Sequence, residues 1–239
     1  MRVLGQGSIH PAAGENMPPH DEYTMWIERE KIGKNVGELQ KSYDLLIEKV
    51  KRIDPLSIAE MTESHYKSNG IPRIVIPFLH SWFVLDLLPY RIRAGHAVID
   101  TLTMKVLVLH HIVAAGENQG SAVRVMGQWI DYRSLQHGAV VGAHLAKSTT
   151  ENLGSYFALD NEQRVARALR WGGKPIELAD QGFVFKFFPR LPVALIHWAG
   201  DEEFPSYSKI LYDISASNYM PTHGLAALTE FLIFRLAEG

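Results

Sequence analysis

The fold of this chain is decided by residues 183–215, which read FVFKFFPRLPVALIHWAGDEEFPSYSKILYDIS. Three runs rich in β-branched and aromatic residues, at 183–188, 193–198 and 210–214, predict three strands. The connections between them are too short for the crossover of a dozen or more residues that parallel pairing requires. We therefore expect adjacent, antiparallel strands.

Outward from this stretch, strands and helices are segregated along the chain rather than strictly alternating. Shorter strand runs at 73–78, 81–87 and 90–94 predict an antiparallel meander in which Pro77 marks an edge or a bulge. Helical periodicity and capping residues predict helices over 36–52, from Asp54 to Ser68, over 101–115 behind Asp100, over 136–157, over 161–171 behind Asp160, and from Thr222 to the C-terminus. This order predicts an α+β fold, with an antiparallel sheet packed against helices in a single domain over 36–239.

The first 35 residues are predicted to form an extended N-terminal arm, because proline and glycine interrupt them repeatedly. Met17, Met25 and Trp26 are apolar residues in a poor composition for a solvated tail. We expect the arm to contact another polypeptide through Trp26 and Ile27, in a complex with a partner protein or a homo-oligomer. The alternative is that Trp26 closes the core of its own domain.

Composition excludes several classes of protein. The 239 residues carry 24 Lys and Arg against 26 Asp and Glu, a net charge of −2, so the chain as a whole has no basic footprint and we expect no nucleic-acid partner. There is no cysteine, which excludes a cysteine-ligated iron–sulfur cluster in this chain. The longest apolar run, 106–115, is about half the length of a membrane span, so we expect no membrane span and a cytoplasmic protein.

The densest group of acidic side chains follows the strand at 193–198. Asp201, Glu202 and Glu203 are consecutive, Asp213 ends the next strand, and His197 precedes the turn. Carboxylate oxygens with one imidazole nitrogen predict a site for a divalent metal such as magnesium or manganese. The alternative is a structural hairpin turn whose acids cap the backbone and pair with Arg190.

Histidine and tryptophan side chains supply a second set of candidates, for binding a cofactor. These residues are His110, His111, His144 and Trp198. His110 and His111 are adjacent on a predicted buried helix and point about 100° apart, which favours one histidine in the core and one at its rim over a shared ligand. We also expect Trp129 and Trp198 to be mostly buried.

The segments FFPRLP (187–192), WAGDEEFP (198–205) and ILYDIS (210–215), together with 127–135 and Gly138, resemble an uncharacterised family, the domain of unknown function 3786. The resemblance covers roughly residues 38–238. It implies membership of a family found mostly in anaerobic bacteria and archaea. Some of its members carry a cysteine-rich iron–sulfur module, and some resemble neighbours of corrinoid-dependent one-carbon metabolism. This chain differs from the members with an iron–sulfur module, because it has no cysteine.

Two functions compete at this point. The first is a non-catalytic accessory or binding protein that serves a redox, corrinoid or other tetrapyrrole-dependent enzyme system. The second is a metal-dependent hydrolase that uses the acidic turn at 201–203. The nucleotide-binding loops G-x-G-x-x-G and G-x-x-x-x-G-K-[ST] and the hydrolase motifs H-E-x-x-H and G-x-S-x-G do not occur, so whether the chain is an enzyme stays open.

Overall fold

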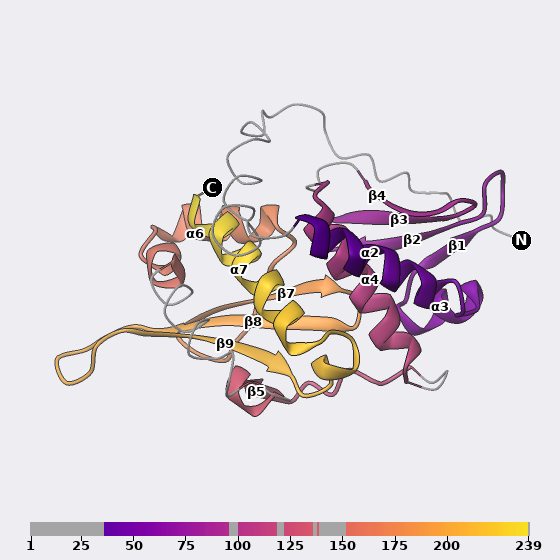
Figure 1. The fold of residues 1–239 in the computed structure, drawn as a ribbon. Helices are drawn as coiled ribbons and strands as arrows, with labels where there is room; N and C mark the ends of the chain where they lie inside the picture. The colour runs from indigo at the N-terminus through magenta and orange to yellow at the C-terminus, as the bar shows by residue number, and fades with distance from the viewer. Residues whose placement is uncertain (1–35, 96–99, 119–121, 136–137, 139–151, 239) are drawn as a thin grey trace, which may run out of the picture. The chain divides into compact units, whose positions relative to one another are not determined.

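A computed structural model gives the fold for residues 36–95, 100–118, 122–135, 138 and 152–238 (Figure 1). It contains helices and two antiparallel sheets, which confirms the α+β prediction. The predicted arm over 1–35 and most of the predicted helix over 136–157 lie outside the described residues. Among the described residues, no helix has the length and apolar character to cross a membrane.

The first sheet is a four-stranded antiparallel meander in the order β1-β2-β3-β4. Its strands are β1 (His65–Lys67), β2 (Arg73–Phe78), β3 (Ser81–Leu87) and β4 (Tyr90–Ala94). The prediction was right for the last three and wrong for β1, because the helix that begins after Asp54 ends at Met61 rather than Ser68. Pro77 lies beyond the residues of β2 that pair with β1, so its missing N–H interrupts no bond to that strand.

The second sheet has five strands in the order β5-β9-β8-β7-β6. Its strands are β5 (Trp129–Asp131), β6 (Lys174–Pro175), β7 (Gln181–Phe188), β8 (Leu191–Trp198) and β9 (Tyr207–Asp213). Strands β7, β8 and β9 are adjacent and antiparallel, as predicted. They place Phe183, Leu195 and Ile210 side by side on one face.

The helices with described bounds are α2 (Val36–Val50), α3 (Pro55–Met61), α4 (Leu102–Gly116), α6 (Asn161–Arg170) and α7 (Thr222–Glu238). Short 3-10 turns, η1 (Tyr132–Ser134) and η2 (Ala216–Asn218), lie between them. The predicted N-caps of α3 and α6 are confirmed. The Asp54 carboxylate accepts the Ser57 N–H at 2.8 Å, and the Asp160 carboxylate accepts the Gln163 N–H at 2.8 Å.

The predicted N-cap of α4 was wrong by one residue. The Thr101 hydroxyl, not the Asp100 carboxylate, accepts the Met104 N–H, at 3.2 Å. The Asp100 carboxylate instead forms an ion pair with Lys105 Nζ at 2.7 Å. Thr101 is in the extended backbone conformation that an N-cap adopts, which places its hydroxyl over the first turn.

Helix α7 lies across β7, β8 and β9 (Figure 1) and buries its apolar side against them. The Tyr212 hydroxyl of β9 lies 2.8 Å from the Thr229 hydroxyl of α7, inside the core. The two sheets meet at the turn between β2 and β3, where the Leu79 N–H donates to the Phe187 carbonyl at 3.1 Å. At this junction the Phe78 ring of β2 also contacts the rings of Phe187 and Phe188 of β7.

Candidate functional site

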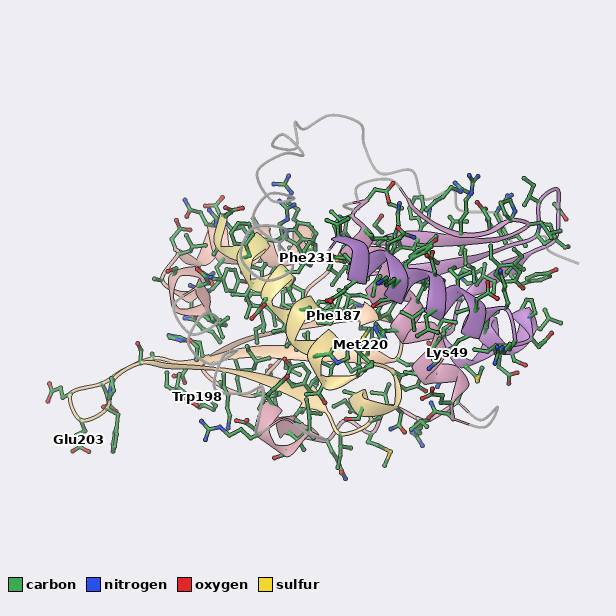
Figure 2. The ribbon with its side chains drawn as sticks, viewed as in Figure 1. Lys49, Phe187, Trp198, Glu203, Met220 and Phe231 are labelled. Atoms are coloured by element: carbon green, nitrogen blue, oxygen red, sulfur yellow. The ribbon has the colours of Figure 1, made fainter. Side chains whose placement is uncertain are left out.

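The acidic turn predicted at 201–203 lies at the tip of the hairpin formed by β8 and β9. Figure 2 shows Glu203 at this tip, which projects beyond the body of the sheet, and Trp198 nearer to its base. Residues 199–206 form the tip and are exposed. We call residues 198–207 the acidic hairpin.

The turn of the acidic hairpin is closed by its own hydrogen bonds. The Asp201 N–H donates to the Phe204 carbonyl at 2.9 Å, and Asp201 Oδ1 accepts the N–H groups of Glu203 at 2.9 Å and Phe204 at 2.7 Å. The Phe204 and Glu203 N–H groups hold the pKa of Asp201 below its ordinary value. Gly200 is required by close approach, because a Cβ atom there would lie 2.6 Å from Ser206 N. The turn therefore has one defined conformation.

The acidic hairpin also carries three exposed aromatic side chains. Phe204 is 68% exposed, Tyr207 is 55% exposed and Trp198 is 37% exposed. Trp198 and Tyr207 are cross-strand partners whose rings stack with centroids 5.8 Å apart. Trp198 is less buried than expected, because the hairpin extends past the body of the sheet (Figure 2). Trp129, which was also expected to be mostly buried, is half-buried in β5.

His197 lies on the opposite face of β8 from Trp198, as the alternation of a strand requires. Its Nδ1 lies 2.8 Å from the Ser208 hydroxyl, and its ring stacks on Phe157 with centroids 4.9 Å apart. Burial and then the charge of Arg164 lower the pKa of His197. His197 therefore packs against the domain and does not face the acidic turn.

Arg190 does not pair with the acidic turn, so this prediction was wrong. Its Nη2 lies 3.0 Å from Glu63 Oε1, and its Nη1 donates to the Val123 carbonyl at 3.4 Å. Arg190 lies in the turn between β7 and β8, at the other end of β8 from the acidic hairpin. It joins this turn to the segment that follows α3.

Asp213 is separated from the other predicted metal ligands by the length of β9, about 20 Å. Its carboxylate is fully buried and accepts four hydrogen bonds, from Met126 N, Gly127 N, Ser215 N and the Ser215 hydroxyl. Burial raises the pKa of Asp213, but these hydrogen bonds outweigh it and leave the pKa below its ordinary value. Asp213 thus holds the loop before β5 against the end of β9.

The structure does not bring the predicted metal ligands together. The side chains of Asp201, Glu202 and Glu203 are exposed at the hairpin tip, whereas Asp213 is enclosed at the far end of β9. Within the described residues, no group of three or more histidines and acids is arranged to hold a metal ion.

The predicted division of the histidine pair, one in the core and one at its rim, is confirmed. His111 is fully buried, its Nδ1 lies 2.9 Å from the Tyr219 carbonyl, and its Nε2 has no partner among the described residues. His110 is half-buried, with its ring centroid 5.3 Å from that of His223. Burial is the main cause that lowers the pKa of each to about 4. His144 lies outside the described residues.

Sequence reasoning missed Phe204 and Tyr207 as parts of the candidate site. Phe204 could have been identified from the sequence, because it lies between three acids and a proline. That position belongs to a connection and not to a strand. Chemically, the acidic hairpin offers negative charge and aromatic surface on a fixed turn. That combination suits binding to another molecule.

Comparison with known proteins supports one assignment. The family model described as "Domain of unknown function (DUF3786)" matches residues 54–235, most of the chain. No curated protein and no solved structure gives a significant match. The chain belongs to the DUF3786 family of uncharacterised domains.

Proposed function

We propose that this chain is an accessory protein that docks onto a partner protein through the acidic hairpin. The observation that carries the proposal is Phe204, 68% exposed beside three acids in a turn closed by its own hydrogen bonds. The partner surface that fits is an apolar pocket for Phe204 with lysine or arginine at its rim. The negative charges of the hairpin would steer such a surface toward it.

The conformation of the turn favours binding energetically. A segment already held in one conformation loses little entropy when it binds, so more of the contact energy contributes to affinity. Aromatic side chains are also enriched among the residues that dominate protein interfaces. Phe204 at the tip and the stacked Trp198 and Tyr207 at the base offer three such side chains.

We further propose that the partner is a cytoplasmic enzyme of a redox, corrinoid or other tetrapyrrole-dependent system. This part of the proposal rests on the family resemblance alone. A direct cofactor-binding role for His111 has less support, because its ring is fully buried and stacked on Phe188. A hydrolase built on the acidic turn also has less support, because Asp213 is buried at the far end of β9 from the exposed acids of the turn.

The experiment is site-specific photo-crosslinking in the native host. A photoreactive phenylalanine at position 204 is compared with the same residue at position 45 on α2, where Leu45 is 63% exposed. We expect one protein to crosslink from position 204 and not from position 45. The purified partner should bind the wild type at least tenfold more tightly than Phe204→Ala or the double variant Glu202→Lys, Glu203→Lys. Equal crosslinking from both positions, or equal affinity of these variants, would refute the proposal.

A further inference from the structure

We propose that the outer face of the four-stranded sheet binds single-stranded nucleic acid. The inner face is apolar core, formed by fully buried side chains that include Ile74, Ile76, Phe83 and Leu85. The outer face is defined by the alternate residues of β1 to β4. It carries four cations around one acid, together with an exposed tryptophan.

Strand register assembles the outer face from residues far apart in the sequence. Lys67 pairs with Arg73, Arg73 with Asp86, and Asp86 with Arg91, which makes one straight row across all four strands. Directly paired residues of antiparallel strands share a face. In the next row along the strands, Val84 pairs with Arg93, which adds a fourth cation.

Asp86 fixes the two arginines of β4. Its carboxylate is 2% exposed and accepts Arg93 Nε at 2.6 Å, Arg93 Nη2 at 2.8 Å and Arg91 Nε at 2.9 Å. The hydrogen bonds from Arg93, and then from Arg91, hold the pKa of Asp86 at about 2. The arginine side chains nevertheless remain 56% and 46% exposed. Each guanidinium is thus oriented and keeps N–H groups that can donate to a phosphate.

Lys67 and Arg73 have no acidic partner in the part of the chain that the structure describes. Neither forms an ion pair among the described residues, and Lys67 is exposed. With Arg91 and Arg93, the outer face carries four positive charges and one negative charge, whereas the whole chain has a net charge of −2. The sequence-based expectation of no nucleic-acid partner rested on that whole-chain charge and on the lack of an aromatic–basic stripe in the sequence. Neither shows the charge of a face that four strands assemble.

Trp82 gives the outer face a stacking surface. It is 42% exposed and lies on the same face of β3 as Val84 and Asp86. A Cβ atom at Gly95 would lie 2.5 Å from Trp82 Nε1, so the glycine leaves room for the indole to lie beside the backbone of residue 95. Along β3 the tryptophan is about 13 Å from the row of cations.

This combination fits a single strand better than the other polyanions. A duplex is read by elements that enter a groove, and its bases are not free to stack on a flat sheet. An acidic peptide would satisfy the cations and leave Trp82 without a role. A single strand offers phosphates to the arginines and an unstacked base to the indole, as in other proteins that combine cationic grooves with aromatic platforms.

The test uses the full chain and fluorescence anisotropy with labelled 12-nucleotide single strands of DNA and RNA. Each phosphate contact on a single strand contributes about −0.7 to the slope of log affinity against log salt, so four cations predict a slope of about −3. The double variant Lys67→Ala, Arg73→Ala should make the slope about 1.4 less steep. Trp82→Ala should weaken binding about tenfold or more.

Two comparisons separate this proposal from general attraction of charge. The control is the double variant Lys41→Ala, Arg52→Ala, which removes two exposed cations outside the sheet. It should leave the affinity for the single strand and the salt slope unchanged. A duplex of the same length and poly-glutamate should bind at least tenfold more weakly than the single strand. Arg91 and Arg93 stay intact in all variants, so Asp86 keeps its partners, and thermal unfolding checks that each variant is folded.

The proposal is overturned by any of four results. These are no binding of the single strand at low salt, an equal loss of affinity in the Lys41, Arg52 control variant, equal binding of the duplex, or equal binding of poly-glutamate. None of them bears on the acidic hairpin, which lies on the other sheet and is tested by crosslinking.

Discussion

The imidazole of His111 lies flat on the ring of Phe188, with the ring centroids 3.8 Å apart and 5° between the planes. This contact joins the middle of α4 to the last residue of β7. The His111 Nδ1 is held against the Tyr219 carbonyl, which requires a proton on that nitrogen. Burial favours the uncharged form of this imidazole, so the core is built around a neutral histidine.

The neutral state of His111 makes stability depend on pH. Burial lowers its pKa to about 4 in the folded chain, whereas the unfolded chain has the ordinary value of about 6.5. Below pH 6.5 the unfolded state takes up a proton that the folded state does not, so the contribution is fully present above this pH and is lost as the pH falls toward 4. From pH 7 to 5 we expect a loss of about 2 kcal/mol in the free energy of unfolding.

Urea denaturation of the wild type and His111→Gln over this pH range measures the effect. Glutamine can still donate to the Tyr219 carbonyl but does not titrate. Between pH 7 and 5, the free energy of unfolding of His111→Gln should therefore fall by about 2 kcal/mol less than that of the wild type. His110 is present in both proteins, and its contribution cancels. Parallel curves would show that His111 titrates with an ordinary pKa.

Asp213 supports a second prediction, about stability. Asp213→Ala leaves the N–H groups of Met126, Gly127 and Ser215 without this acceptor. The free energy of unfolding should fall by about 3 kcal/mol or more. Asp213→Asn should cost less, because one amide oxygen remains as acceptor. Chemical denaturation measures both, and Asp201→Ala in the exposed turn should cause no measurable change. If Asp213→Ala is as stable as the wild type, its carboxylate is free for another role.

Strands β2, β3, β4, β7, β8 and β9 could be predicted because each is a local run of β-branched and aromatic residues. The short strand β1 could not, since His65–Lys67 lacks such a run and pairs only because β2 lies beside it. Asp54 and Asp160 could be predicted as N-caps from a few neighbouring residues. At α4, two adjacent residues, Asp100 and Thr101, can each act as an N-cap, and the sequence does not distinguish them.

The candidate sites depend on contacts between residues that are far apart in the sequence, which no local sequence pattern predicts. The sequence predicted that Arg190 pairs with the acids at 201–203, but folding brings it to Glu63, in the segment that follows α3. The outer face of the first sheet was missed for the same reason. Its row of Lys67, Arg73 and Arg91 exists only once the register of four strands is known.

Thr101 and Asp100 give a third prediction, on the N-cap of α4. Thr101→Ala removes the acceptor of the Met104 N–H and should cost about 1 kcal/mol. Asp100→Ala removes a partly exposed ion pair with Lys105 and should cost less than about 0.5 kcal/mol. Thermal and urea unfolding of the two variants measure the difference. If Asp100→Ala were more destabilising than Thr101→Ala, Asp100 and not Thr101 would be the N-cap.

The last prediction concerns the conformation of the acidic hairpin, on which the docking proposal depends. A Cβ atom at position 200 would lie 2.6 Å from Ser206 N and 3.0 Å from the Phe204 carbonyl, so Gly200→Ala must open the turn. The N–H groups of Glu203 and Phe204 would then lose Asp201 Oδ1 and exchange with solvent faster. Global stability should not change, because the turn is exposed and contributes nothing to the core.

Amide hydrogen exchange by NMR measures this effect residue by residue. Asp201→Ala removes the acceptor itself and should accelerate exchange at the same two amides, whereas Glu202→Ala should not. Because Gly200→Ala keeps every acidic and aromatic side chain, it separates conformation from contact. Faster exchange together with weaker partner binding would show that the hairpin binds as a preformed turn, because an open turn has to be ordered at the cost of affinity. Unchanged exchange in both variants would mean that Asp201 does not close the turn.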